Sequence, residues 1–247
     1  MIRGLYVSTS GLVATQQRID ELAGNVSNVS TTGFKEVLAT QEDASTGVSL
    51  DLGLDGGPVS IGQVSYGTVA VGATVNRDQG PLVATGKATD LAISGDGLFV
   101  VGTPSGVAYT RAGDFNLDAS GTLTTQDGYP VLDTAGRPVT VPAGAAAFSV
   151  SPDGTVAGTG QRLAFIAFPA TGVAIGGENL YRITGPVQPV AAGAGTIAQG
   201  SLEASNVDLA SSMTELIAMQ RLFQFSARSL TLQDQTLQDA NSVGSVK

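Results

Sequence analysis

Apolar residues recur at intervals of seven near both ends of the chain. The first row is Leu5, Leu12, Ile19 and Val26, flanked by a second row of Ser8, Thr15, Leu22 and Val29. The row near the other end is Leu209, Leu216, Phe223, Leu230 and Leu237, with Met213 beside it. A seven-residue repeat draws a narrow apolar stripe along a helix, and such a stripe is buried best against another helix. We therefore expect a helix at each end of the chain and a coiled-coil-like pairing of the two.

The limits of these helices can be predicted from local signals. The first is expected over about residues 3–30, with Gly33 as its stop. The second is expected to begin at Ser205 or Asn206, either of which can cap a helix, and neither Gly nor Pro interrupts the run from there to Val243. At a rise of 1.5 Å per residue, the first helix would be about 40 Å long and the second more than about 50 Å.

The middle of the chain has a different pattern, in which short apolar runs alternate with turn signals. Asp-Gly pairs stand at 55–56, 96–97, 127–128 and 153–154, and runs such as LAIS (91–94) and LFVV (98–101) lie between such turns. Frequent tight turns of this kind indicate an antiparallel sheet. The fold class expected is therefore mixed α and β, with an antiparallel β-domain inserted between the helices.

The predicted division of the chain has five parts. They are an N-terminal helical segment over 1–36, an extended loop over 37–63, an antiparallel β-domain over 64–190, a linker over 191–200, and a C-terminal helix over 201–247 that packs with the N-terminal helix. The alternative is a monomer whose two helices both pack on the β-domain. A long helix with a narrow apolar stripe would bury little on one face of such a domain, which favours helix–helix pairing.

Composition excludes several classes of function. The 247 residues include no Cys and no His, so disulfides, cysteine nucleophiles and zinc sites built on those residues are ruled out. The net charge of −9 disfavours nucleic acid as a partner. No apolar run approaches the ~20 residues of a membrane span. The N-terminal stretch lacks a continuous apolar region, so we expect no cleavable secretory signal.

A search for chemistry finds no candidate catalytic, cofactor or metal residues. GPLVATGKAT (80–89) resembles a phosphate-binding loop, but its glycine spacing is wrong and Ala88 stands where the motif needs Ser or Thr. Six aspartates could form a carboxylate pair or bind calcium, although turn positions explain them better: Asp96, Asp114, Asp118, Asp127, Asp133 and Asp153. A glycan hydrolase would also need an aromatic cleft, and the chain has no Trp.

Two glycosylation sequons begin at Asn25 and Asn28. A sugar acceptor must lie on an exposed loop of a protein that enters the secretory pathway. Both asparagines instead fall at the end of the first predicted helix. We interpret them as polar helix-end residues that bond backbone or a neighbouring subunit.

Several motifs together resemble a known family. LAGNVSNVSTTGFK (22–35) and the segment from GSLEASNVDL (200–209) to Val243 are similar to the N- and C-terminal signatures of bacterial flagellar rod and hook proteins, and LAISGDGLFVV and GENLYRIT resemble the β-domain of the rod subunits. Gly24 and Ser27 depart from the usual pattern of Asn and Ala. The motif residues carried over are Asn25, Asn28, Gly33, Phe34, Lys35, Leu202, Glu203, Ser205, Asn206 and Val207.

The resemblance implies a structural subunit of the flagellar basal-body rod, the drive shaft that transmits torque to the hook. In that family the terminal helices form a hollow helical tube. The seven-residue rows, with Leu22, Val29 and Met213, would then be subunit interfaces. The implied partners are other copies, other rod and hook subunits, the flagellar type III export apparatus and, as further candidates, ring (bushing) proteins. MIRGLYVSTSGL and GENLYRIT resemble the distal rod subunit slightly more, while the length fits the proximal one equally well. The alternatives are the proximal rod and, in another class, a secreted calcium-binding or adhesive β-protein.

Overall fold

The computed structural model describes residues 2–50, 59–141, 148–169, 172–186 and 195–244. The chain divides into two compact units that interleave along the sequence. Unit 1 comprises Met1–Val26, Val37–Thr74 and Leu209–Lys247, and unit 2 comprises Ser27–Glu36 and Val75–Asp208. The prediction of a mixed α and β chain, with antiparallel sheets between two terminal helices, is confirmed.

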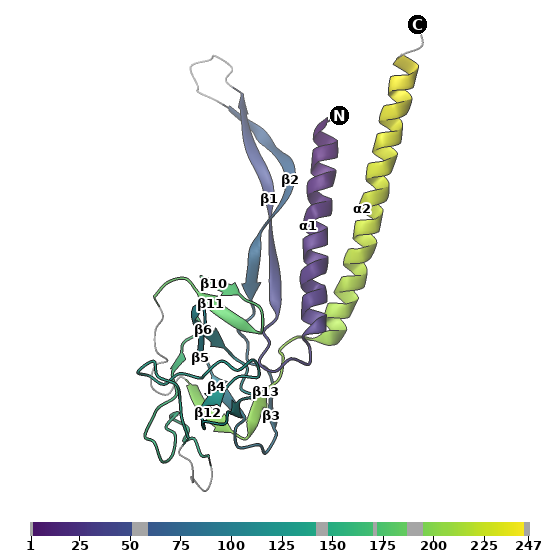
Figure 1. Ribbon diagram of the computed structural model, residues 1–247. Helices are drawn as coiled ribbons and strands as arrows, with labels where there is room; N and C mark the ends of the chain where they lie inside the picture. The colour runs from purple at the N-terminus through teal and green to yellow at the C-terminus, as the bar shows by residue number, and fades with distance from the viewer. Residues whose placement is uncertain (1, 51–58, 142–147, 170–171, 187–194, 245–247) are drawn as a thin grey trace. The chain divides into compact units, whose positions relative to one another are not determined.

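Unit 1 contains the two long helices, α1 (Ile2–Ser27) and α2 (Leu209–Gly244). They run side by side in opposite directions (Figure 1), and Arg18 of α1 forms an ion pair with Glu215 of α2, in which Arg18 Nε lies 3.1 Å from Glu215 Oε1. About one turn from these residues, Ala14 and Ser212 are each only 3% exposed. The side chains buried at this level of the two helices are therefore small.

Both helices differ slightly from their predicted limits. α1 ends at Ser27 rather than near residue 30, because the chain from Ser27 to Glu36 turns into unit 2. α2 begins at Leu209, so neither Ser205 nor Asn206 caps it. The Ser205 hydroxyl accepts a hydrogen bond from the Val207 amide at 3.3 Å instead, and the Asn206 side chain binds elsewhere.

Unit 1 also holds a two-stranded sheet of β1 (Val37–Leu50) and β2 (Val59–Val75). The sequence predicts an extended loop over 37–63, and this is wrong for the described part of that range. Gly, Ser and Asp residues favour loops in isolation, yet strand formation depends more on the pairing partner than on intrinsic preference. The Asp-Gly pair at 55–56 lies outside the described residues.

Unit 2 is built around a five-stranded antiparallel sheet in the order β10-β11-β6-β5-β9. Its strands are β5 (Leu98–Thr103), β6 (Gly106–Thr110), β9 (Phe165–Ile166), β10 (Val173–Ile175) and β11 (Leu180–Ile183). Side chains alternate across β5, so Phe99 and Val101 enter one apolar cluster while Leu98 and Val100 enter another. Burial on both faces explains why LFVV reads as an unbroken apolar run.

Three two-stranded sheets complete unit 2. They pair β3 (Leu82–Ala84) with β13 (Ser201–Glu203), β4 (Leu91–Gly95) with β12 (Gly195–Gln199), and β7 (Asn116–Leu117) with β8 (Leu123–Thr124). The β-domain thus extends to Glu203, whereas the sequence predicts a linker over 191–200 and a helical segment from 201. Residues 187–194 of that region lie outside the described ranges.

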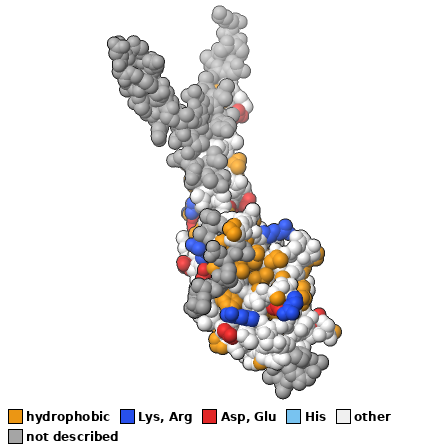
Figure 2. Space-filling model, turned by 90° about the vertical axis from the view of Figure 1, so that its left-hand side faces the viewer, with side chains coloured by type: hydrophobic (Ala, Val, Ile, Leu, Met, Phe, Trp, Pro, Cys, Tyr) orange, Lys and Arg blue, Asp and Glu red, His pale blue; other side chains and the backbone are white. Residues whose placement is uncertain are grey.

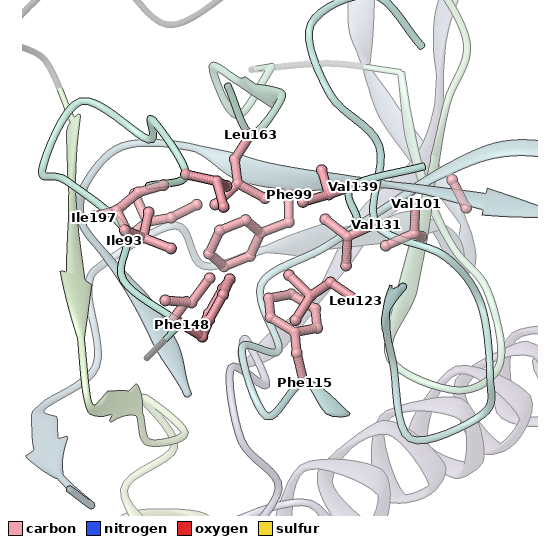
Figure 3. Close-up of a cluster of buried hydrophobic side chains, with 14 residues drawn as sticks. Ile93, Phe99, Val101, Phe115, Leu123, Val131, Val139, Phe148, Leu163 and Ile197 are labelled. Carbon is pink, nitrogen blue, oxygen red and sulfur yellow. The ribbon is translucent and has the colours of Figure 1, made fainter. Parts of the chain in front are cut away.

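The larger core of unit 2 gathers side chains from well-separated segments (Figure 3). Phe99 and Phe115 meet edge to face at its centre, with ring centroids 5.1 Å apart. Leu123, Val131, Val139 and Leu163 have no exposed surface. Among the described residues, no helix has the length and apolar character needed to cross a membrane.

Candidate functional site

A buried cluster of charges joins three separated parts of unit 2, and we call it the motif node: Lys35, Arg111 and Glu203. Glu203 accepts hydrogen bonds from Lys35 Nζ to Oε1 and from Arg111 Nε to Oε2, both at 2.6 Å. The three side chains are between 1% and 3% exposed. Two of these residues belong to the motifs near the chain ends, and Arg111 follows the β6 strand.

Each charge of the motif node is also bonded to backbone. The Gly80 amide donates to Glu203 Oε1 at 2.9 Å, and Lys35 Nζ donates to the Asp78 carbonyl at 2.6 Å. Arg111 Nη2 donates to the carbonyls of Ile93 and Gly95 at 2.8 and 2.7 Å, and its Nη1 donates to Gly97. Buried charges are tolerated when their donors and acceptors are matched in this way.

The electrostatics of the motif node are those of a structural ion pair. Burial lowers the pKa of Lys35, while its hydrogen bond to Glu203 acts in the opposite direction. Burial likewise raises the pKa of the nearby Tyr181 phenol above its usual value. Two cations surround one carboxylate in an enclosed site, an arrangement that holds three chain segments together.

Gly33 allows the N-terminal segment to reach the motif node. Its φ is +66°, and a Cβ at this position would lie 2.5 Å from the Arg111 carbonyl oxygen and 2.6 Å from the Ala112 nitrogen. The Gly33 amide donates to the Glu203 carbonyl at 2.7 Å. Only glycine combines this backbone conformation with so close an approach. The half-buried Phe34 that follows leads directly into Lys35.

Asn206 ties the same region together through its side chain. Its Oδ1 accepts the Glu36 amide at 2.7 Å, and its Nδ2 donates to the carbonyls of Asn76 and Asp78 at 3.1 and 2.9 Å. The other residues of the C-terminal motif are Leu202, in β13 and half-buried, and the buried Ser205 and Val207. This motif therefore belongs to unit 2 rather than to a helix.

The side chain of Asn25 is buried and hydrogen-bonded within the fold. Its Nδ2 donates to the Val37 carbonyl at 2.8 Å, its Oδ1 accepts the Val37 amide at 2.9 Å, and the residue is 1% exposed. These two bonds join the end of α1 to the start of β1. Asn28 Oδ1 accepts the Thr31 hydroxyl at 3.0 Å in the turn after α1. The buried position of Asn25 is incompatible with its use as a sugar acceptor.

The seven-residue row of α1 is partly covered. Leu12, Ile19 and Val26 are half-buried, and Leu22 of the flanking row is 8% exposed. Val29 is half-buried beyond the helix end, in unit 2. The side chain of Leu5 falls outside what the structure describes.

The row of α2 is more open. Leu209 and Met213 are 41% and 49% exposed, and the other members are half-buried: Leu216, Phe223, Leu230 and Leu237. Sequence reasoning missed Phe225 and Leu232, which are 72% and 62% exposed. These two are also seven residues apart, a signal that the stronger first row obscured. It also missed Arg111, for which the sequence carries no comparable signal.

The aspartates of unit 2 are engaged in turns. Asp118 Oδ1 accepts the amides of Ser120 and Thr122 at 2.8 and 2.7 Å, and Asp153 accepts the Thr155 amide and hydroxyl. Hydrogen bonds lower the pKa of both carboxyls. Within the described ranges, no group of three or more carboxylates is arranged to hold a metal ion.

The surface of unit 2 carries both kinds of charge. On the face shown in Figure 2, hydrophobic side chains gather in one area, and Lys, Arg, Asp and Glu side chains are scattered around them. Unit 2 also exposes single apolar residues, among them Val107 and Ile175 at 55% and 44%. The scattered charges of the described residues on this face form no basic patch of the kind that binds nucleic acid.

Comparison with known proteins shows which family this chain resembles. A family model described as "Flagella basal body rod protein" matches residues 5–35, "Flagellar hook protein FlgE/F/G D1 domain" matches 92–158, and "Flagellar basal body rod FlgEFG protein C-terminal" matches 198–243. The flagellar basal-body rod protein FlgG of Bacillus subtilis (strain 168) is 35% identical over 264 residues, covering 97% of this chain and 98% of its own length. The chain belongs to the flagellar rod and hook family.

Other members of this family give the same result. The rod protein FlgF of Caulobacter vibrioides is 34% identical over 93% of both chains, and FlgG of Borreliella burgdorferi is 32% identical over 98% of this chain. The flagellar rod family is structural rather than enzymatic, and its members are components of the flagellar basal body. Each residue of the motif node lies in a different one of the three family models.

Proposed function

We propose that this chain is a subunit of the flagellar rod that assembles through α1 and α2 into a hollow helical tube, which transmits torque from the motor to the hook. The observation that carries the proposal is the uneven burial of the helices. Near the ion pair between the two helices the buried residues are small, namely Ala14 and Ser212, whereas larger apolar residues such as Leu209 and Met213 remain exposed. Two helices that leave this much apolar surface in water are expected to bury it against another molecule.

Coiled-coil-like packing of α1 and α2 with neighbouring copies would bury the two seven-residue rows. Each Leu removed from water contributes about 1.5–3 kcal/mol, so several half-exposed positions together can offset the ordering of the helices. Contacts between unlike surfaces of identical copies generate an open-ended helical assembly. A tube of indefinite length needs contacts of that kind.

The motif node supports the same function in a different way. A drive shaft carries torsional load, and Lys35, Arg111 and Glu203 fasten the segments leading to both helices to the β-domain through buried ionic bonds. Charge-assisted hydrogen bonds of this type are stronger than neutral ones. A load that reaches unit 2 through either of these segments would thereby be shared with its sheets.

Within the rod we favour the distal position, on the resemblance of MIRGLYVSTSGL and GENLYRIT to the distal subunit. The proximal rod is the alternative, because the relatives include both FlgG and FlgF proteins. The partners proposed are other copies, adjoining rod and hook subunits, the type III export apparatus that delivers the chain, and ring proteins around the shaft.

The decisive variant is Leu216→Asp, which places a charge in the α2 row. We expect cells carrying it to secrete the subunit but to lack complete rods in electron micrographs of isolated basal bodies. Gln224→Asp is the matched control, because Gln224 is an exposed polar residue of the same helix that lies outside the row. Normal rods in the Leu216→Asp strain would overturn assembly through this row.

A further inference from the structure

α2 carries a second apolar row on the side opposite the first. The first row includes Leu209, Leu216 and Phe223, and the second row is Ala218, Phe225 and Leu232. Each member of the second row follows its counterpart in the first by nine residues. At 3.6 residues per turn this is about two and a half turns, so the two rows face in opposite directions.

Among the side chains that the structure describes, those of the second row include the two most exposed large apolar residues of either helix. Phe225 and Leu232 are 72% and 62% exposed, and Leu222, one turn before Phe225, is 47% exposed. An aromatic side chain can bury ~150–250 Å², so Phe225 alone leaves on the order of 100 Å² of ring in water. With its neighbours, the second row approaches the area of the few hundred Å² that marks an interaction site.

The remaining two sides of α2 have other roles. One side faces α1 and contains Ser212 and Glu215, the partner of Arg18. The other is exposed and mostly polar, with Arg221, Gln224, Arg228 and Gln235, and it also carries Ile217, which is 53% exposed. A helix with one intramolecular side, one polar side and two opposed apolar sides matches the environment of a helix placed between two others.

We infer that the second row of α2 receives the first row of α2 from a second copy of this chain. The inference rests on the proposed function, and it names the surface that the first row of α2 contacts in the assembled rod. When identical helices stand side by side and point the same way, each presents one side to the copy before it and the opposite side to the copy after it. Two apolar rows on opposite sides of one helix fit that arrangement. A twofold dimer would use one row against itself and leave the other exposed.

Charge also favours displaced, unlike contact over in-register contact. The charged side chains of this stretch of α2 are two arginines, Arg221 and Arg228, with Glu215 before them and Asp234 after them. Two parallel copies at the same height would bring each charge beside its own kind, which is unfavourable. A shift along the axis of thirteen residues, about 20 Å at 1.5 Å per residue, instead sets Asp234 of one copy level with Arg221 of the other, while Glu215 keeps its partner Arg18 on α1.

The first test compares three aspartate variants in cells: Phe225→Asp, Leu216→Asp and the polar-side control Gln224→Asp. We expect rods to be lost with the first two and retained with the third, while the purified Phe225→Asp protein keeps the melting temperature of the parent. Loss with Leu216→Asp alone would refute the second row as an interface and leave the proposed function standing. Rods in all three strains would refute both.

The second test uses the absence of cysteine from the chain. Copies carrying Phe225→Cys are co-expressed with differently tagged copies carrying Leu209→Cys, Leu216→Cys, Phe223→Cys or Leu230→Cys, and isolated basal bodies are oxidised. We expect a disulfide between unlike copies for at least one of the four pairs and none between two Phe225→Cys copies. Cross-linking only between like copies, or none with any pair, would overturn the inference.

Discussion

Lys35 and Glu203 are 168 residues apart in the sequence, yet Lys35 Nζ lies 2.6 Å from Glu203 Oε1 and both side chains are almost completely buried. The pair brings together the segment that follows α1 and the segment that precedes α2. Arg111 reaches the other oxygen of the same carboxylate from the β-domain. Glu203 is therefore the residue through which the three parts are held.

Removing the carboxylate charge should cost more than removing one cation. In Glu203→Gln, Lys35 and Arg111 remain buried without a counter-charge, and we expect the free energy of unfolding to fall by about 3–5 kcal/mol. In Lys35→Met, the Arg111–Glu203 pair stays balanced, so the loss should be smaller. Denaturant unfolding of the purified variants measures both values.

A double-mutant cycle separates this account from simple disruption of packing. If Lys35 and Glu203 interact, the double variant Lys35→Met/Glu203→Gln should lose less stability than the sum of the two single variants. Additive losses, or a greater loss for Lys35→Met than for Glu203→Gln, would contradict the assigned role of Glu203.

Gly33→Ala should destabilise unit 2, because the added Cβ would meet the Arg111 backbone at a residue with positive φ. Strain and crowding together should cost at least about 1–3 kcal/mol. Gly24→Ala is the matched control, since a Cβ on Gly24 meets nothing within 4 Å and α1 is helical there. Thermal melts should show a lower midpoint for the first variant and an unchanged or higher one for the second. Equal midpoints would mean that the backbone at Gly33 is not constrained.

Asn25→Ala should weaken the junction between α1 and β1. The change removes two hydrogen bonds to Val37 and leaves its backbone groups without these partners, at a cost of about 1–3 kcal/mol. Ser27→Ala destroys the same sequon while sparing both bonds. A stability loss confined to Asn25→Ala is therefore expected, and a defect shared by the two variants would point to glycosylation instead.

Acid should destabilise the β-domain through its turn aspartates. Hydrogen bonds in the folded state lower the pKa of Asp118 and Asp153 from the ordinary value of 3.8. Their stabilising effect is complete above that value and is lost as the pH falls through the lower folded pKa. The variant Asp118→Asn/Asp153→Asn should therefore lose less of its melting temperature below about pH 4 than the parent does. Parallel curves would show that these turns do not set the acid response.

The sequence predicts those parts of the fold whose signals are local and repeated. The seven-residue rows locate α1 and α2 to within a few residues, and turn signals identify the antiparallel domain. The β12 strand was missed because its partner, β4, is far away in the sequence and TIAQ has no strong strand pattern of its own. The β1 strand was missed although it pairs with the next strand, β2, because TGVSL also lacks such a pattern.

The candidate site, too, was only partly predictable from the sequence. Lys35 and Glu203 can be singled out by motif, but nothing in the sequence indicates that their charges meet or that Arg111 joins them. Phe225 and Leu232 carry a detectable seven-residue spacing, whose meaning depends on the exposure that only the structure provides. Assignment of the rows as subunit interfaces stays a prediction.

The measurement that tests the central claim most directly is electron microscopy of basal bodies isolated from a strain that lacks this gene, with a complemented strain as control. The account predicts basal bodies with a missing or shortened rod and no hook, and the length of the remaining rod would distinguish a distal from a proximal position. Complete rods with hooks in the deletion strain would contradict the proposal that this chain builds the rod.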